Sequence, residues 1–160
     1  MTENINTLIS SQYLFFILDN EKYALKTDNI KEIVDLQNIR KVPKSNKCIK
    51  GVTNIRGELI PVIDLKIRLD IGEVIKNRKT SLIIVNILDS LDGKNVPIAI
   101  MVDSVVEVED IFEVDILETP IFGTKIDEKY IQNIIKFEDN YITLLKIDVL
   151  LDIEELSSVD

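Results

Sequence analysis

The sequence contains no histidine and no tryptophan, and it has a single cysteine, Cys48. Histidine is the commonest general base and metal ligand, so the usual forms of both kinds of site are excluded. Cys48 has no histidine with which to form a nucleophilic pair, and it cannot form an internal disulfide. A lone cysteine is typical of a protein in a reducing cytoplasm. These absences argue against an enzyme and against a bound metal.

Phosphate-binding loops and long apolar runs are missing too. Neither G-x-x-x-x-G-K-[ST] nor G-x-G-x-x-G occurs. No run reaches the ~18 apolar residues of a membrane span, and the first residues lack the basic start of a signal peptide. We therefore expect a cytoplasmic protein without a cofactor and without direct membrane insertion.

Positive charge is scarce, with 19 Lys and Arg against 28 Asp and Glu and a formal charge of −9. Nucleic acids and anionic membranes attract proteins through clustered Lys and Arg, so this balance argues against both. A protein partner stays open. The acid-rich stretch from Glu107 to Glu118 has neither the spacing nor the glycine of an EF-hand, and it indicates a solvated surface.

What the chain has in quantity is β-branched apolar residues, 28 Ile and 14 Val. Such side chains fit a half-buried sheet, so the chain is predicted to be all-β. Residues 49–69 form the clearest unit. Two apolar runs flank a turn at Arg56–Gly57, where glycine tolerates a positive φ. Pro61 predicts that the second run is an edge strand or carries the proline where its missing N–H faces outward.

An internal duplication is indicated by two sets of matches. Asp28 to Ile33 matches Asp103 to Val108 at an offset of 75, and residues 52–69 match residues 134–151 at an offset of 82. About five short strands per copy predict two small barrels that share a buried face. The predicted organisation is a domain over 12–152 between a tail over 1–11 and a tail over 153–160. Within the domain the lobes lie at about 13–80 and 81–151. Strand exchange between the lobes stays open.

The motif at residues 49–57, I-K-G-V-T-N-I-R-G, followed by I-P-V-I-D-L at residues 60–65, resembles the CheW family of chemotaxis coupling proteins. Supporting matches are Y-L-x-F-x-L at 13–18, I-x-E-I at 30–33 and V-D-x-V at 102–105. The similarity runs from about residue 13 to residue 151. Ile55 replaces a leucine that is common in the family, a conservative difference.

This resemblance implies two five-stranded SH3-like barrels packed together, and a non-enzymatic scaffold that links methyl-accepting chemoreceptor tips to the regulatory domain of the histidine kinase CheA. Other CheW copies in rings are a further implied partner, and the location would be peripheral to the membrane through receptor arrays. The implied receptor- and kinase-binding residues are Ile30, Glu32, Ile33, Gly51, Val52, Arg56, Gly57 and Leu59.

Two of these residues, Glu32 and Arg56, are predicted to form a salt bridge that serves the partners of the first lobe. The matching residues of the second copy, Glu107 and Glu138, are both acids and cannot pair. Kinase contact is predicted around Gly51–Val52 and at the edge that contains Pro61. Asp64 is predicted to cap a short helix, and Cys48 to be an incidental loop thiol.

Two other classes of function stay open. One is a stand-alone CheW-like regulatory module of another two-component pathway, for example surface motility. The other is a small-molecule binder, which predicts a pocket between the lobes.

Overall fold

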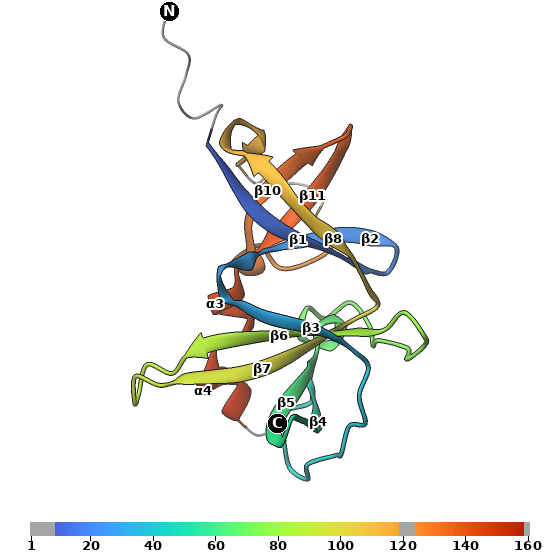
Figure 1. Cartoon of the computed structure of the whole chain (residues 1–160), viewed down its shortest axis with the longest axis vertical. Helices are drawn as coiled ribbons and strands as arrows, with labels where there is room; N and C mark the ends of the chain where they lie inside the picture. Colours follow the sequence, from blue (N-terminus) through green and yellow to red (C-terminus); the bar gives the residue numbers. More distant parts are fainter. Residues whose placement is uncertain (1–8, 119–123, 159–160) are drawn as a thin grey trace, which may run out of the picture.

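The runs rich in Ile, Val and Leu form the strands of two β-sheets in the computed structural model, which describes residues 9–118 and 124–158 (Figure 1). The six-stranded sheet has the order β8 (Ser104–Phe112), β1 (Ser10–Leu18), β2 (Glu21–Lys26), β11 (Asn140–Leu145), β10 (Ile131–Phe137), β9 (Ile116–Leu117). The five-stranded sheet has the order β3 (Ile30–Asp35), β6 (Ser81–Leu88), β7 (Asn95–Val102), β5 (Glu58–Asp64), β4 (Ile49–Ile55). The all-β prediction is confirmed.

Three hairpins turn through two residues that both have positive φ, namely Asp19–Asn20, Arg56–Gly57 and Glu138–Asp139. Positive φ at both central residues is the type I′ geometry, whose twist matches that of the flanking strands. Asn, Asp and Gly tolerate this region of backbone space best. These turns join β1 to β2, β4 to β5 and β10 to β11.

The duplication appears in the strand order. Each strand of the second sheet has a counterpart from the other copy at the same place in the first sheet: β8 corresponds to β3, β1 to β6, β2 to β7, β11 to β5 and β10 to β4. The two sheets therefore have the same strand order. The one parallel pairing in each sheet also corresponds, β2 with β11 and β7 with β5. Each copy therefore gives its first two strands to one sheet and its remaining strands to the other. The sheets do not coincide with the lobes 13–80 and 81–151.

Two details differ from the predicted pair of five-stranded barrels. β9 adds a sixth, two-residue strand to one sheet, and strand pairing among the described residues closes neither sheet into a barrel. The predicted tails are partly structured: Ser10 begins β1, and Ile153–Ser157 forms the helix α4 with Leu156 buried. Residues 1–8 and 159–160 lie outside the described part of the chain, as do Pro120 and Gly123.

The main hydrophobic core lies between the sheets. It takes alternate residues from β1 and β6, for example Leu14 and Phe16 from one sheet with Ile83 and Val85 from the other. Alternation places the intervening residues in two outer clusters, one on each sheet. Full burial of a side chain of this size contributes roughly 1.5–3 kcal/mol. Cys48 belongs to the main core and is 3% exposed, so its thiol is buried rather than an incidental loop group.

The remaining elements are short: α2 (Leu65–Arg68), α3 (Ile147–Leu150), α4 and the 3₁₀ turns η1 (Thr27–Asn29), η2 (Glu113–Asp115) and η3 (Glu128–Tyr130). In Figure 1, α3 and α4 run along one side from the upper sheet toward the lower one. The predicted cap is confirmed, because Asp64 Oδ1 accepts hydrogen bonds from the N–H groups of Lys66 and Ile67.

Candidate functional site

The tip of the β4–β5 hairpin is held by its own sequence. Arg56 has φ of 52° and Gly57 has φ of 85°, and the Gly57 N–H donates to Asn54 Oδ1 at 2.8 Å. This local bond closes the turn and sends the Arg56 side chain outward, where it is 75% exposed. The hairpin therefore presents a guanidinium, which has five donors in a planar fork, at its tip.

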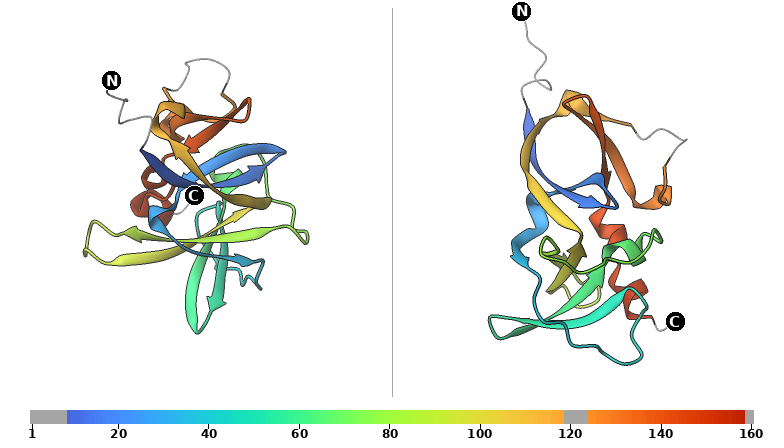
Figure 2. Two further views of the ribbon diagram at one scale, coloured as in Figure 1. Left: turned by 45° about the horizontal axis from the view of Figure 1, so that its top comes forward. Right: turned by 90° about the vertical axis from the view of Figure 1, so that its right-hand side faces the viewer.

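Arg56 forms the predicted salt bridge with Glu32, at 2.5 Å between Nη1 and Oε2. Glu32 lies on β3, and β3 and β4 are the two opposite edge strands of the five-stranded sheet. The contact therefore links β3 to the turn between β4 and β5, a hairpin that lies on the side of the molecule opposite the six-stranded sheet (Figure 2). The salt bridge itself is confirmed, and the prediction that it serves partners rather than the barrel stays a prediction.

The Glu32 carboxylate is more buried than an ordinary surface carboxylate. Its side chain is only 19% exposed, and Oε1 is buried without a hydrogen-bond partner among the described residues. A buried oxygen without a partner carries a desolvation cost, which makes the bond from Arg56 to the other oxygen more important for keeping Glu32 in place. Period-2 alternation along β3 is confirmed, since Ile30 and Glu32 are half-buried and Ile33 is exposed.

The equivalent place in the six-stranded sheet is acidic. Glu107 lies on the edge strand β8, and Glu138 lies in the β10–β11 turn. A hydrogen bond with Glu107 raises the pKa of Glu109, and the charge of Glu138 raises it further. Like charges gathered in one place favour the protonated form of a carboxyl. The two sheets thus share a topology but differ in charge at these matching positions.

The loop that precedes β4 covers part of β4, an edge strand of the five-stranded sheet. Arg40 and Val52 exchange two backbone hydrogen bonds of 2.8 Å, and Thr53 Oγ1 donates to the Asn38 carbonyl at 2.8 Å. Gly51 makes this approach possible, because a Cβ atom there would lie 2.1 Å from the Arg40 carbonyl oxygen. The outer edge of β4 at Val52 is therefore already occupied by the chain itself.

Pro61 does not lie on an edge strand. β5 is paired with β4 on one side and with β7 on the other, and the pairing with β7 begins one residue later, at Val62. The missing N–H of Pro61 thus costs no hydrogen bond to β7. This agrees with the second of the two predicted possibilities, a proline placed where its missing N–H is not needed for strand pairing. The predicted kinase contact at an edge containing Pro61 needs correction, because the edge of this hairpin is β4.

The other predicted site residues divide by exposure. Leu59 is 66% exposed and Ile33 is 40% exposed. Ile30 and Val52 are half-buried, and Gly51 is buried. Apolar groups in contact with water thus lie on both elements that the salt bridge joins. Sequence reasoning missed Asn54, although asparagine three residues before a turn glycine is a recognisable signal, and it missed Arg40, whose contacts use the backbone alone.

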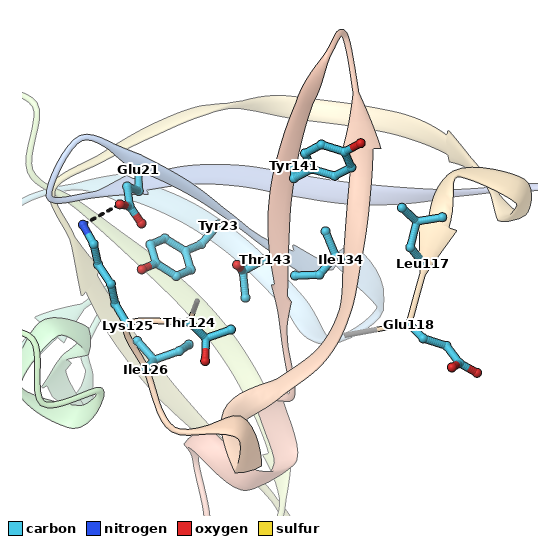
Figure 3. Close-up of a pocket in the computed structure, with 10 residues that line it drawn as sticks. All are labelled: Glu21, Tyr23, Leu117, Glu118, Thr124, Lys125, Ile126, Ile134, Tyr141 and Thr143. Atoms are coloured by element: carbon cyan, nitrogen blue, oxygen red, sulfur yellow. Dashed lines mark ion pairs between the residues drawn. The ribbon is translucent and has the colours of Figure 1, made fainter. Parts of the chain in front are cut away.

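A cavity of about 570 Å³ lies elsewhere, against β2, β10 and β11 of the six-stranded sheet (Figure 3). Tyr23, Ile134 and Thr143 line it, Tyr141 stands at its side, and an ion pair between Lys125 and Glu21 lies at one end. Its lining takes Glu21 and Tyr23 from the first predicted lobe, 13–80, and the other residues from the second, 81–151. It therefore fits the pocket between the lobes that the small-molecule alternative predicts, and that alternative stays a prediction. Within residues 9–118 and 124–158, no three His, Cys, Asp or Glu residues form a group that could hold a metal ion.

No helix among the described residues is long and apolar enough to cross a membrane. Two packed sheets with a charged hairpin turn define the class of protein, an all-β fold. The chain belongs to the CheW family, because the family model described as "CheW-like domain" matches residues 12–155.

Relatives with known names agree with this assignment. The chain is 28% identical over 152 residues to the chemotaxis protein CheW of Klebsiella aerogenes, covering 95% of this chain and 88% of the relative. It is 28% identical to CheW of Bacillus subtilis, covering 99% and 96%. The crystal structure of the scaffolding protein TtCheW from Thermoanaerobacter tengcongensis matches with a TM-score of 0.80 and 33% identity, covering 94% and 98%.

Proposed function

We propose that this protein couples methyl-accepting chemoreceptors to the histidine kinase CheA and allows the receptors to control the kinase. Membership of a scaffold family supports the proposal. The observation that carries it is the Glu32–Arg56 pair, an oriented guanidinium beside exposed apolar groups. Well-packed apolar contacts with an arginine among them are typical of protein interfaces.

The proposed contact surface, called here the hairpin surface, combines β3 with the β4–β5 hairpin. Its exposed members are Ile33, Arg56 and Leu59, with Ile30, Glu32 and Val52 half-buried beside them. Gly51 and Gly57 act through the backbone, by admitting the Arg40 loop and by closing the turn. The protein would reach the membrane only through the receptors, and the kinase regulatory domain or further copies of the family would bind beside it.

The test is co-sedimentation with receptor-bearing membranes, with and without the kinase. Leu59→Asp should reduce the amount of kinase that sediments, because a charge replaces an apolar contact. Leu88→Asp is the matched control, since Leu88 is 64% exposed and lies at the end of β6, outside the hairpin surface. Circular dichroism of both variants should match the unchanged protein.

Three results would contradict the proposal. The unchanged protein would fail to sediment with receptors and kinase, or Leu59→Asp would bind as well as the control, or both leucine variants would lose binding equally. The first result refutes the coupling function, and the other two refute the hairpin surface.

A further inference from the structure

The short helix α2 carries a buried lysine that contacts the opposite sheet. Lys66 is 7% exposed, and its Nζ lies 2.5 Å from Asp19 Oδ1 and 2.9 Å from Asp103 Oδ2. The Asp19 N–H also donates to Asp103 Oδ2 at 2.8 Å. An ammonium removed from water needs such partners, since burial without them is costly. Three segments far apart in the sequence therefore meet at one charged point, called here the Lys66 cluster.

The Lys66 cluster lies where the chain passes between the sheets. Asp103 is the single residue between β7 of the five-stranded sheet and β8 of the six-stranded sheet, and Asp19 is in the β1–β2 turn. Lys66 itself follows β5 by two residues, so it belongs to the five-stranded sheet. The ammonium thus holds the crossing residue and one hairpin turn of the other sheet together.

At the second crossing no ion pair is found among the described residues. The chain also passes between the sheets at η1, and the duplication matches Asp28 with Asp103 and Asp148 with Lys66. Two carboxylates cannot form the pair that Lys66 forms, so the internal symmetry is broken at this point. The sheets are thus joined by buried charge at Asp103, whereas η1 has no buried residue.

Apolar packing alone leaves the angle between two sheets weakly specified, because the hydrophobic effect is not directional. Hydrogen-bonded ion pairs have fixed partners and distances, and buried ones can select one arrangement among several similar ones. Arg68, also on α2, adds a second link, since its Nε and Nη2 donate to the carbonyls of Leu150 and Val149 at 2.7 and 3.0 Å. Lys66 therefore binds two residues that adjoin strands of the six-stranded sheet, and Arg68 binds α3, the helix that follows β11 of that sheet.

We propose that Lys66 is a positioning residue that sets the angle between the two sheets. α2 follows β5 without a break, and β5 begins at the Arg56–Gly57 turn. The Lys66 cluster therefore also sets how the hairpin surface is oriented relative to the six-stranded sheet. The proposal deepens the proposed function, on which its functional part rests: a scaffold that contacts different partners must hold its surfaces at a defined angle.

The structural test measures residual dipolar couplings of backbone amides in both sheets. In the unchanged protein one alignment tensor should fit both sheets. In Lys66→Met, which replaces the ammonium with an apolar chain of similar length, the common tensor should be lost and each sheet should need its own. Lys66→Arg keeps the charge and should restore the common tensor. Lys94→Met, at an exposed lysine in the β6–β7 turn, is the matched control.

A second variant protects the test if Lys66→Met does not fold. Asp103→Asn keeps the shape and an acceptor for the Asp19 N–H but removes the charge at the crossing, and it should weaken the common alignment in the same direction. A common tensor with unchanged orientation in the folded variants would overturn the proposal.

The functional test uses the full protein with receptors and kinase. Lys66→Met should still sediment with both partners but lose receptor control of kinase activity, and Lys66→Arg should regain it. Separate tensors together with normal kinase control would overturn the functional part of the proposal. Failure of the unchanged protein to couple would instead refute the proposed function, while the dipolar couplings would still decide the role of Lys66.

Discussion

Gly51→Ala should destabilise the protein strongly, because two backbone segments meet at this position. Gly51 has φ of +146°, and an added Cβ would lie 2.1 Å from the Arg40 carbonyl oxygen and 2.7 Å from its carbon. Real Cβ atoms essentially never approach other atoms closer than 3.0 Å, and the obstacle here is backbone rather than a flexible side chain. The Arg40 segment or β4 must therefore move.

That movement breaks identifiable contacts. Arg40 and Val52 exchange two backbone hydrogen bonds of 2.8 Å, each of which contributes about 0.5–1.5 kcal/mol. An unfavourable φ adds about 1–3 kcal/mol. Gly51→Ala should thus lower the free energy of unfolding by about 2–6 kcal/mol, a large part of the 5–15 kcal/mol that is typical of a domain.

The assay is equilibrium unfolding in urea followed by circular dichroism. Gly72→Ala is the matched control, because Gly72 has φ of +138° but nothing within 4 Å of the added Cβ. It should show the strain alone, about 1–3 kcal/mol. Equal losses in the two variants would show that the approach of Arg40 costs nothing and would refute the reasoning.

Three further predictions concern ionisable groups. Burial raises the pKa of Asp64, so its contribution to stability should fall as the pH rises from its ordinary pKa through the raised one. Asp64→Asn should remove this pH dependence of the free energy of unfolding, measured in urea. It should also lower that free energy by ~1–3 kcal/mol at pH 7, because it places an amide NH₂ against the Val74 N–H. Glu32→Arg and Arg56→Glu should each impair receptor control of the kinase, and the double variant should restore part of it. Glu32→Arg should cost more stability than Arg56→Glu, because the Glu32 side chain is 19% exposed and the Arg56 side chain is 75% exposed. An additive loss in the double variant would show that the residues act separately. Burial and nearby carboxylates raise the pKa of Tyr23 to about 12, so stability should fall between pH 10 and 12, and ultraviolet titration should lose this late transition in Tyr23→Phe.

Local features of the fold could be predicted because short-range chemistry decides them. The Arg56–Gly57 turn, the Asp64 cap and the strands at 82–88 and 96–102 all follow from residues within a few positions of one another. The Glu32–Arg56 pair could be predicted as well, although the two residues are 24 positions apart, because the resemblance places both in one copy of a repeated unit.

Other features depend on which segments meet in space. The offsets of 75 and 82 show which strands correspond, but they do not show that each copy divides its strands between the sheets. β5 could be an edge or an inner strand from its sequence, and only the pairing with β7 makes it inner. Alternating apolar residues specify which face of a strand is buried but not which neighbour it pairs with.

The sequence by itself determined the all-β class, the tight turns and the repeat, because propensity and periodicity act within a few residues. Tertiary structure alone decided the contacts of Gly51 and Lys66. Gly51 meets a backbone carbonyl, which any residue at position 40 would supply, and Lys66 joins Asp19 to Asp103, 84 residues apart. The chain has 28 acids that Lys66 could pair with, and only the packing of the two sheets selects these two.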